Sequence, residues 1–156
     1  TVIQMGSGYP SKRWPVSNFR MLIERWLEKT AGTVFLVGQK GEEELAAGIS
    51  SGGNVVNWVG KTSFGELCVL LDLADVFVGN DSGPAHIAAG LGKKTVVLFS
   101  GTNEFRIWRP RGDRVSVLRC EVSCAPCHLK DCPKPRHECM EGISVEQVLQ
   151  TVLSPL

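Results

Sequence analysis

Apolar residues occur along this chain with two different spacings, one continuous and one periodic. The continuous runs are short and rich in β-branched residues, and glycine or polar residues follow most of them. Runs of this kind predict β-strands that are buried on both faces, as in a parallel sheet. They occupy residues 1–5, 33–38, 54–60, 75–79 and 95–100, with a weaker run at 115–118.

Between the first two runs, apolar residues recur at helical spacing across residues 19–27. This pattern predicts an amphipathic helix, for which Ser17 is the expected N-cap and Gly32 the expected stop. Acidic residues at 42–44 favour the start of a second helix, because negative charge is stabilised at the positive end of the helix dipole. The first part of the chain is therefore predicted to alternate strand and helix.

Two later segments carry the capping-box spacing of a helix start. Ser63 is followed three residues later by Glu66, and Ser144 by Gln147 at the same spacing. In such a box the serine side chain and the Glu or Gln side chain each accept from a backbone N–H group of the first turn. Apolar faces follow both boxes, and a shorter helix is predicted at residues 84–91.

The order of these elements predicts the fold class. Continuous apolar strands that alternate with amphipathic helices indicate an α/β fold, a Rossmann-like, doubly wound parallel sheet covered on both faces. Sheets of this kind bind ligands beyond the carboxyl ends of their strands. Functional residues are therefore expected in the loops that follow residues 5, 38, 60, 79 and 100.

Composition narrows the classes of protein that fit this pattern. The chain has 156 residues, of which 43% are apolar and 21% charged, and this predicts one globular domain over residues 1–156. The formal net charge of +1 gives no electrostatic basis for a nucleic-acid partner. No apolar stretch approaches the length of a membrane span. The chain opens with Thr1 directly in a predicted strand, and we expect it to be one domain of a longer protein.

The loop after the first strand, "GSGYPSKRWP", nearly matches the glycine-rich fingerprint of dinucleotide-binding folds. Ser11 stands where the third glycine is expected, and Pro10 and Pro15 delay the start of the next helix. Lys12 and Arg13 project from this lengthened loop. The basic pair fits an anion-binding loop and equally a solvated basic turn.

The loop after the fourth strand, "GNDSGPAH", gathers residues that suit an anion-binding helix start. Asp81 or Ser82 is expected to cap the helix, Gly83 permits close approach of a ligand, and Pro84 needs no N–H in the first turn. His86 adds a donor in that turn. The free N–H groups of a helix start attract phosphate, so the combination favours a diphosphate cradle over a capped helix with a core histidine.

Several motifs together resemble glycosyltransferase family 9, the ADP-heptose:lipopolysaccharide heptosyltransferases. They are "SKRWP" before a helix, "VG" before an acidic helix start, the long segment "VGKTSFGELCVLLDLADVFVGNDSGPAHIAAGLGKKTVVLFSGTN" and a cysteine-rich segment after it. The resemblance covers nearly the whole chain, and D-[ST]-G-x-x-H is its most specific part. The family has two facing Rossmann-like halves, the GT-B arrangement. The resemblance implies that this chain is the C-terminal, donor-binding half.

The resemblance also implies roles for individual residues. Lys12 matches the family's lysine on the donor phosphates, and Glu42 matches the acid that holds the ribose hydroxyls. The stretch from Gly60 to Ser63, with Lys61 and Thr62 at its centre, would lie near the adenine through backbone contacts, and Ser7 would face the donor from the first loop. The diphosphate cradle is assigned to Asp81, Ser82, Gly83, Pro84 and His86.

For a member of this family the implied reaction is inverting transfer of heptose from ADP-heptose to the inner core of lipopolysaccharide. The implied location is the cytoplasmic face of the bacterial inner membrane, with peripheral membrane association of the full-length enzyme. The sequence has no D-x-D motif, so no divalent metal or other cofactor is expected, and Lys12 with a helix N-terminus would stabilise the departing diphosphate. The family's catalytic aspartate belongs to the N-terminal half. No catalytic residue is therefore assigned here, and the chain is expected to bind donor without turnover.

Cysteines are concentrated between residues 120 and 139, whereas Cys68 lies alone on a predicted helix. A structural metal, reduced thiols and disulfides all fit this segment, although the reducing compartment implied by the resemblance disfavours disulfides. No metal ligand is assigned. The residues with metal-knuckle spacing or close to it are Cys120, Cys124, Cys127, Cys132, Cys139, His128 and His137.

Three alternatives remain open at this point. The first is a GT-B transferase that uses a different nucleotide sugar, and the second is a non-enzymatic, cysteine-rich metal-binding module. The third is a dinucleotide oxidoreductase domain. The broken glycine fingerprint and the lack of an acid at the end of the second strand, at residues 37–39, disfavour the third.

Overall fold

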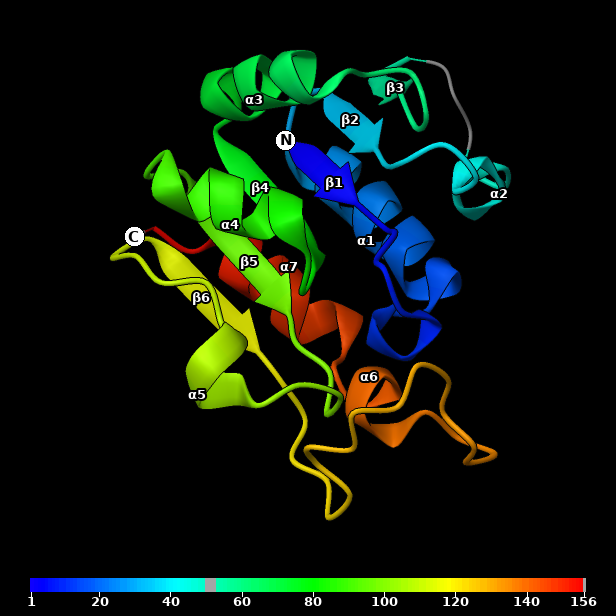
Figure 1. Ribbon diagram of the computed structural model, residues 1–156. Helices are drawn as coiled ribbons and strands as arrows, with labels where there is room; N and C mark the ends of the chain where they lie inside the picture. The colour runs from blue at the N-terminus through cyan, green and yellow to red at the C-terminus, as the bar shows by residue number, and fades with distance from the viewer. Residues whose placement is uncertain (50–52, 156) are drawn as a thin grey trace.

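A computed structural model describes residues 1–49 and 53–155 of the chain. Its centre is a parallel sheet of six strands in the order β3-β2-β1-β4-β5-β6 (Figure 1). This is the strand order of a Rossmann-like fold, and it confirms the predicted fold class. The strands are β1 (Val2–Gln4), β2 (Val34–Val37), β3 (Val55–Asn57), β4 (Val76–Asn80), β5 (Lys94–Leu98) and β6 (Val115–Leu118).

Helices cover both faces of the sheet (Figure 1). One face is covered by α1 (Val16–Lys29), α2 (Glu43–Ala46) and α7 (Val145–Leu153), the other by α3 (Phe64–Leu73) and α4 (Gly83–Gly90). Three short helices lie in loops at the carboxyl end of the sheet: η1 (Pro10–Lys12), α5 (Phe105–Trp108) and α6 (Glu138–Glu141).

The core consists of two apolar layers, one on each face of the sheet. The layer under α1 and α7 includes Trp14 and Phe19, whose rings pack edge to face with centroids 4.9 Å apart. The layer under α3 and α4 includes Leu71, Phe77 and Phe99, each at most 1% exposed. Because strand side chains alternate between the faces, the continuous apolar runs of the sequence supply both layers.

The sequence predicted the existence of the strands and the longer helices, and the structure corrects their ends. Both capping boxes are present, at Ser63 before α3 and at Ser144 before α7. The prediction that Ser17 caps the first helix is wrong, because α1 already begins at Val16 and its N-cap is Pro15. The carbonyl of Pro15 accepts from the N–H groups of residues 18 and 19, so the first turn forms upstream of the serine.

The predicted stop at Gly32 is also wrong, because α1 ends at Lys29 and Thr30 is extended. The Thr30 hydroxyl donates to the carbonyl of Trp26 in the last turn. Gly32 instead lies against the Trp26 ring, where an added Cβ would come within 2.5 Å of the ring. Within residues 1–49 and 53–155, no helix has the length and apolar character that crossing a membrane requires.

Candidate functional site

The candidate site lies where the order of the strands reverses. β1 pairs in parallel with β2 on one side and with β4 on the other. The chain leaves the carboxyl ends of β1 and β4 toward opposite sides of the sheet, and this opens a crevice between the two loops. A cavity of about 460 Å³ lies there, and we call it the switch-point cleft.

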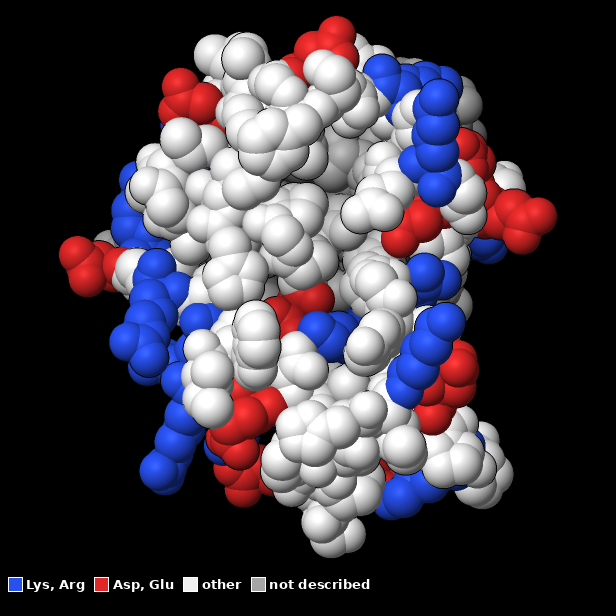
Figure 2. Space-filling model, in the orientation of Figure 1, with Lys and Arg blue, Asp and Glu red and all other residues white. Residues whose placement is uncertain are grey.

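The lining of the switch-point cleft has a polar part and an apolar part. The polar part comes mainly from the ends of β1 and β4, and its side chains are Gln4, Ser7, Lys12, Asp81 and Ser82. The apolar part comes from β2, α3 and α4, and its side chains are Val37, Phe64, Leu67, Pro84 and Ile87. Figure 2 shows that the surface over α3 and α4 is almost free of charged side chains. A ligand with one flat apolar end and one anionic end fits this division.

An ion pair forms the centre of the polar part. Lys12 Nζ lies 2.9 Å from Asp81 Oδ2, and the two side chains are only 15% and 5% exposed. The same carboxylate oxygen accepts a hydrogen bond from Asn103 Nδ2 at 3.0 Å. The lysine keeps further N–H donors beyond the one given to Asp81, since an ammonium group carries three. The pair is neutral as a whole and both side chains line the cleft, but Lys12 keeps donors from which a phosphate can accept.

The position of Lys12 is fixed by its neighbour Ser11, which occupies the third position of the broken glycine fingerprint. Ser11 is 2% exposed, and its N–H and hydroxyl donate to the carbonyls of Lys130 and Leu129. The hydroxyl of Thr102 donates to Ser11 as well. The segment 120–139 thus braces the loop that carries Lys12, and a glycine at position 11 would lose the side-chain part of this contact.

A second bracing residue, Asn80 at the end of β4, was not assigned a role from the sequence. It is fully buried, and its amide oxygen accepts from the N–H of Trp14 at 2.9 Å. Its Nδ2 donates to the carbonyls of Met5 and Gly6 at 2.7 and 3.3 Å. One side chain therefore joins the β4 loop to both ends of the β1 loop. The sequence does contain a signal for Asn80, which is a polar residue at the end of an apolar strand. The residues that it bonds to, however, are distant in the chain.

The start of α4 lies at the cleft without a side-chain cap. Ser82 occupies the N-cap position, yet neither it nor Asp81 caps the helix, so the predicted cap is wrong. The Ser82 hydroxyl bonds instead to Gln4 Oε1 and to the carbonyl of Asn80. Pro84 brings no N–H, and an added Cβ at Gly83 would meet nothing within 4 Å. The N–H of Ala85 donates to the carbonyl of Ser82, so Gly83 carries the N–H that the start of α4 offers to an anion in the cleft.

The start of α3 forms another wall, with Thr62 and Ser63 in the lining. Here the Ser63 hydroxyl accepts from the N–H of Glu66, and the Glu66 carboxylate accepts from the N–H of Ser63. These bonds hold the pKa of Glu66 below its ordinary value of 4.5. Lys61 is turned away, since its Nζ donates to the carbonyl of Asn57, and it is absent from the lining.

Two further predicted residues lie beside the cleft rather than in its lining. Glu42 is 11% exposed, and its carboxylate accepts from the N–H of Gln39 at 2.9 Å and lies 3.6 Å from the guanidinium of Arg13. It packs so closely on Gly6 that an added Cβ there would lie 2.0 Å from Glu42 Oε2. His86 is 46% exposed, and its Nε2 lies 4.0 Å from Asp81 Oδ1.

The structure therefore brings most of the predicted site residues to one cavity. Ser7, Lys12, Thr62 and the run 81–84 line the switch-point cleft, whereas Glu42, Lys61 and His86 do not. Residues of the lining that were not predicted are Gln4, Gly8, Val37, Gly38, Gln39, Phe64, Leu67 and Ile87. Most of these are apolar or glycine residues, which carry no chemical signal for binding. Their role comes from their position in the wall of the cleft.

All six cysteines are free thiols in this structure. Burial raises the pKa of the Cys139 thiol, and the nearby cysteines 124, 127 and 132 act in the same direction. Across the described part of the chain, no group of three or more His, Cys, Asp or Glu side chains is arranged to hold a metal ion.

The sequence and the fold both match known proteins. The profile of glycosyltransferase family 9 (heptosyltransferase) matches residues 1–137. Lipooligosaccharide heptosyltransferase 2 of Campylobacter jejuni serotype O:2 is 30% identical over 145 residues, which are 90% of this chain and 45% of that protein. The structure of E. coli ADP-heptose lipopolysaccharide heptosyltransferase II superposes with a TM-score of 0.80 at 22% identity, over 96% of this chain and 44% of that one.

A third similar structure is TibC of enterotoxigenic E. coli H10407, an iron-containing dodecameric heptosyltransferase solved with ADP-D-β-D-heptose. It superposes with a TM-score of 0.73 at 17% identity, over 97% of this chain and 43% of that one. The chain thus spans less than half the length of each of these proteins. Because the family profile covers most of the chain, the protein belongs to glycosyltransferase family 9, the heptosyltransferase family.

Proposed function

We propose that this chain is the donor-binding part of an inverting glycosyltransferase that transfers heptose from ADP-heptose to the inner core of lipopolysaccharide. One observation carries the proposal. The switch-point cleft joins an apolar wall to a partly buried lysine and an open helix start, which is the division that a nucleoside diphosphate requires. Family membership and the ADP-heptose named for the E. coli and TibC structures support the choice of sugar and base.

The residues of the cleft take separate parts of the donor in this proposal. Lys12 and the N–H of Gly83 at the start of α4 bind the diphosphate, with His86 reaching it from the first turn of the helix. The adenine lies against Phe64, near the backbone of Thr62. Glu42 accepts from the ribose hydroxyls through the carboxylate that Gln39 and Arg13 already orient.

The same residues supply the part of the chemistry that this chain contributes. As the glycosidic bond to the β-phosphate breaks, negative charge grows on the departing diphosphate. Lys12 and the dipole of α4 stabilise that charge in a position fixed before the reaction, because Ser11 and Asn80 hold the two loops in place. The base that takes the acceptor proton is assigned to a part of the enzyme outside this chain, so the chain binds donor without turning it over.

The acceptor and the location follow from the same proposal. The acceptor is the lipopolysaccharide inner core, which the other half of a GT-B enzyme would present across the cleft. The working location is the cytoplasmic face of the bacterial inner membrane, with peripheral association of the full-length enzyme. No nucleic-acid partner is proposed, because the formal net charge is +1.

Calorimetric titration with ADP, UDP and GDP, each with magnesium and with a chelator, tests the proposal. We expect ADP to bind most tightly and its affinity to survive chelation. His86→Ala and Glu42→Gln are expected to weaken ADP several-fold, because each removes one polar contact of about 1 kcal/mol. A preference for UDP or GDP would keep the glycosyltransferase but overturn the heptose donor. Absence of nucleotide binding to the folded chain would contradict the proposal.

A further inference from the structure

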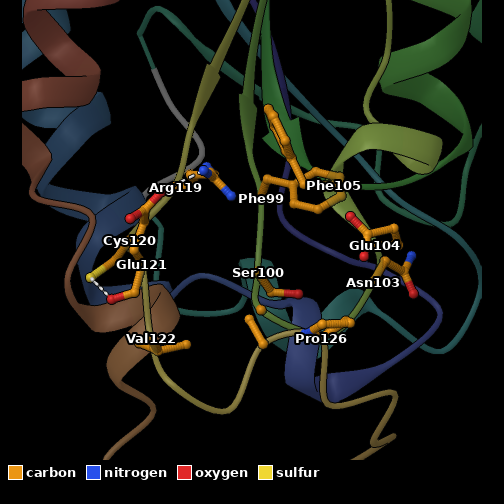
Figure 3. Close-up of a pocket in the computed structure, with 12 residues that line it drawn as sticks. Phe99, Ser100, Asn103, Glu104, Phe105, Arg119, Cys120, Glu121, Val122 and Pro126 are labelled. Atoms are coloured by element: carbon orange, nitrogen blue, oxygen red, sulfur yellow. Dashed lines mark hydrogen bonds and ion pairs between the residues drawn. The ribbon is translucent and has the colours of Figure 1, made fainter.

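A second cavity lies beside the switch-point cleft, beyond the carboxyl ends of β5 and β6. Its volume is about 280 Å³, and we call it the β5–β6 cavity. Figure 3 shows residues 119–122 along one wall and residues 103–105 along the opposite wall, with Ser100 and Pro126 between them. None of the roles proposed above for the nucleotide uses this space.

The walls of the β5–β6 cavity combine an aromatic cluster with charged side chains. The rings of Phe99 and Phe105 meet edge to face, with centroids 5.4 Å apart. The guanidinium of Arg119 stacks over the Phe105 ring at 4.4 Å and pairs with the carboxylate of Glu121 at 2.5 Å. Glu104 projects from the opposite wall (Figure 3). Stacking on Phe105 thus orients the guanidinium of Arg119, whereas the carboxylate of Glu121 is 81% exposed.

One side chain connects the two cavities. Asn103 lines the β5–β6 cavity, and its amide group donates at 3.0 Å to Asp81, which lines the switch-point cleft. Asp81 is also the partner of Lys12, the residue proposed to bind the diphosphate. The β5–β6 cavity therefore begins one hydrogen-bonded pair away from the proposed phosphate position. A group joined to the phosphates, or a group reacting next to them, is within reach of it.

The charges in the lining select the kind of ligand. Glu104 and Glu121 carry two negative charges against the single positive charge of Arg119. Phosphates and sugar acids are disfavoured by this excess of negative charge, and Arg119 is already neutralised by its partner. A neutral ring with several hydroxyls can donate to the carboxylates and place its apolar face on Val122 and Pro126.

We propose that the β5–β6 cavity is a carbohydrate subsite for a neutral pyranose residue, set next to the nucleotide site. The proposal rests on the donor-binding function proposed above. A neutral pyranose can reach this cavity from two sources: the sugar carried by the nucleotide, or a neutral sugar residue of the acceptor. Both would bring hydroxyl groups to Glu104 and an apolar ring face to the opposite wall.

Two variants with matched controls test the subsite. Ala125→Trp fills the cavity from its exposed rim, and Ala31→Trp makes the same change at an exposed position that lines neither cavity. Glu104→Gln removes one negative charge from the lining, with Glu28→Gln on α1 as its control. Calorimetry measures ADP and ADP-heptose, and ligand-observed NMR compares methyl α-mannoside with glucuronic acid, each with and without ADP.

The ADP dissociation constant is expected to stay within twofold in all four variants, because none of them touches the switch-point cleft. If the donor sugar occupies the subsite, Ala125→Trp weakens ADP-heptose about tenfold, the effect of losing one or two hydrogen bonds. If an acceptor sugar occupies it, ADP-heptose is unchanged and the methyl α-mannoside signal disappears in that variant. Glu104→Gln is expected to reduce the preference of the chain for the mannoside over glucuronic acid.

Three results would overturn the subsite. The first is a wild-type chain that binds ADP-heptose no more tightly than ADP and does not bind the mannoside. The second is a wild-type preference for glucuronic acid over the mannoside. The third is an unchanged binding of both sugar ligands in Ala125→Trp. Failure of the donor-binding function gives a different result, because the wild-type chain then fails to bind ADP while the mannoside signal without ADP still reports on the β5–β6 cavity.

Discussion

Two helices, α3 and α4, begin at the switch-point cleft, and the backbone N–H groups of their first turns are bonded in different ways. Every α-helix starts with N–H groups that have no partner inside the helix. At the start of α3, the reciprocal bonds of Ser63 and Glu66 occupy such groups. At the start of α4, Ser82 turns its hydroxyl to Gln4 and the carbonyl of Asn80 and leaves the helix without a side-chain cap.

This difference distinguishes a helix start that only stabilises the fold from one that can bind a ligand. A capped start is neutralised by its own chain, so α3 offers the cleft apolar side chains such as Phe64 and Leu67. The uncapped start of α4 keeps the N–H of Gly83 and the positive end of the helix dipole for a ligand, and Lys12 brings further N–H donors beside it. The comparison predicts that phosphate recognition depends on α4 and its neighbours, and that α3 contributes mainly to the base.

Among the variants that test this comparison, Lys12→Met is expected to have the largest effect, a loss of ADP affinity. The substitution leaves the buried carboxylate of Asp81 without its cation, directly where the diphosphate is proposed to bind. We expect ADP to bind about a hundredfold more weakly, close to 3 kcal/mol, because an attractive charge is lost and a repulsive one is exposed. Calorimetric titration measures it, with Lys61→Met as the control, since Lys61 bonds to Asn57 outside the lining. Equal losses in both variants would place the phosphates elsewhere.

The next effect is expected from Asn80→Ala, which removes the side chain that joins the β4 loop to the β1 loop. Three backbone groups of Met5, Gly6 and Trp14 lose their partner in a buried region. We expect the free energy of unfolding to fall by about 2 kcal/mol, the cost of leaving such groups unsatisfied. Urea denaturation measures it against Asn54→Ala, an exposed asparagine. If both variants lose the same stability, Asn80 does not brace the open helix start.

A smaller effect is expected from Phe64→Ala, which tests the role given to α3. The ring is 73% exposed and lines the cleft, so its removal leaves the fold intact but takes away the proposed platform for the adenine. We expect ADP to bind roughly tenfold more weakly, about 1.4 kcal/mol, the upper range for stacking on an aromatic ring. Leu73→Ala is the control, because Leu73 lies at the far end of α3, is 77% exposed and does not line the cleft. An unchanged affinity in Phe64→Ala would remove α3 from base recognition.

Sequence patterns predicted what is local and periodic in this molecule. The capping boxes of α3 and α7 need only residues three positions apart, and both are present. The meeting of Lys12 and Asp81 was also predictable, because parallel strands bring their carboxyl ends to one edge of the sheet. The first helix was misjudged at Ser17, since the turn had already started at Pro15.

What depends on distant parts of the chain was not predictable. The Ser11 hydroxyl finds its acceptor 118 residues away, at the carbonyl of Leu129. The β5–β6 cavity needs Glu104 and Arg119 on opposite walls, and no periodicity links them. Ser82 has the residue type and position of a cap, but Gln4 from another strand competes for its hydroxyl. Competition between local and tertiary partners thus decides which helix start stays open.

The smallest effect is expected from Ser63→Ala, and it isolates the cap of α3. We expect a loss of about 0.5–1 kcal/mol in the free energy of unfolding at pH 7, the usual cost of an exposed serine cap, and an ADP affinity within twofold of the wild type. The pKa of Glu66 lies below 4.5 in the folded chain, so the carboxylate stabilises the fold above that value and loses this effect as the pH falls through the lowered pKa.

The cost of Ser63→Ala should therefore shrink once the pH is below the lowered pKa of Glu66, because the carboxyl group of the capping partner is then protonated. Ser144→Ala is the matched control, since the box before α7 uses the neutral side chain of Gln147 and should cost the same at both pH values. Urea denaturation at pH 7 and at a pH below the lowered pKa of Glu66 measures the two differences. A loss of ADP affinity in Ser63→Ala with no loss in His86→Ala would reverse the comparison, because the capped helix start would then be the one that binds the phosphates.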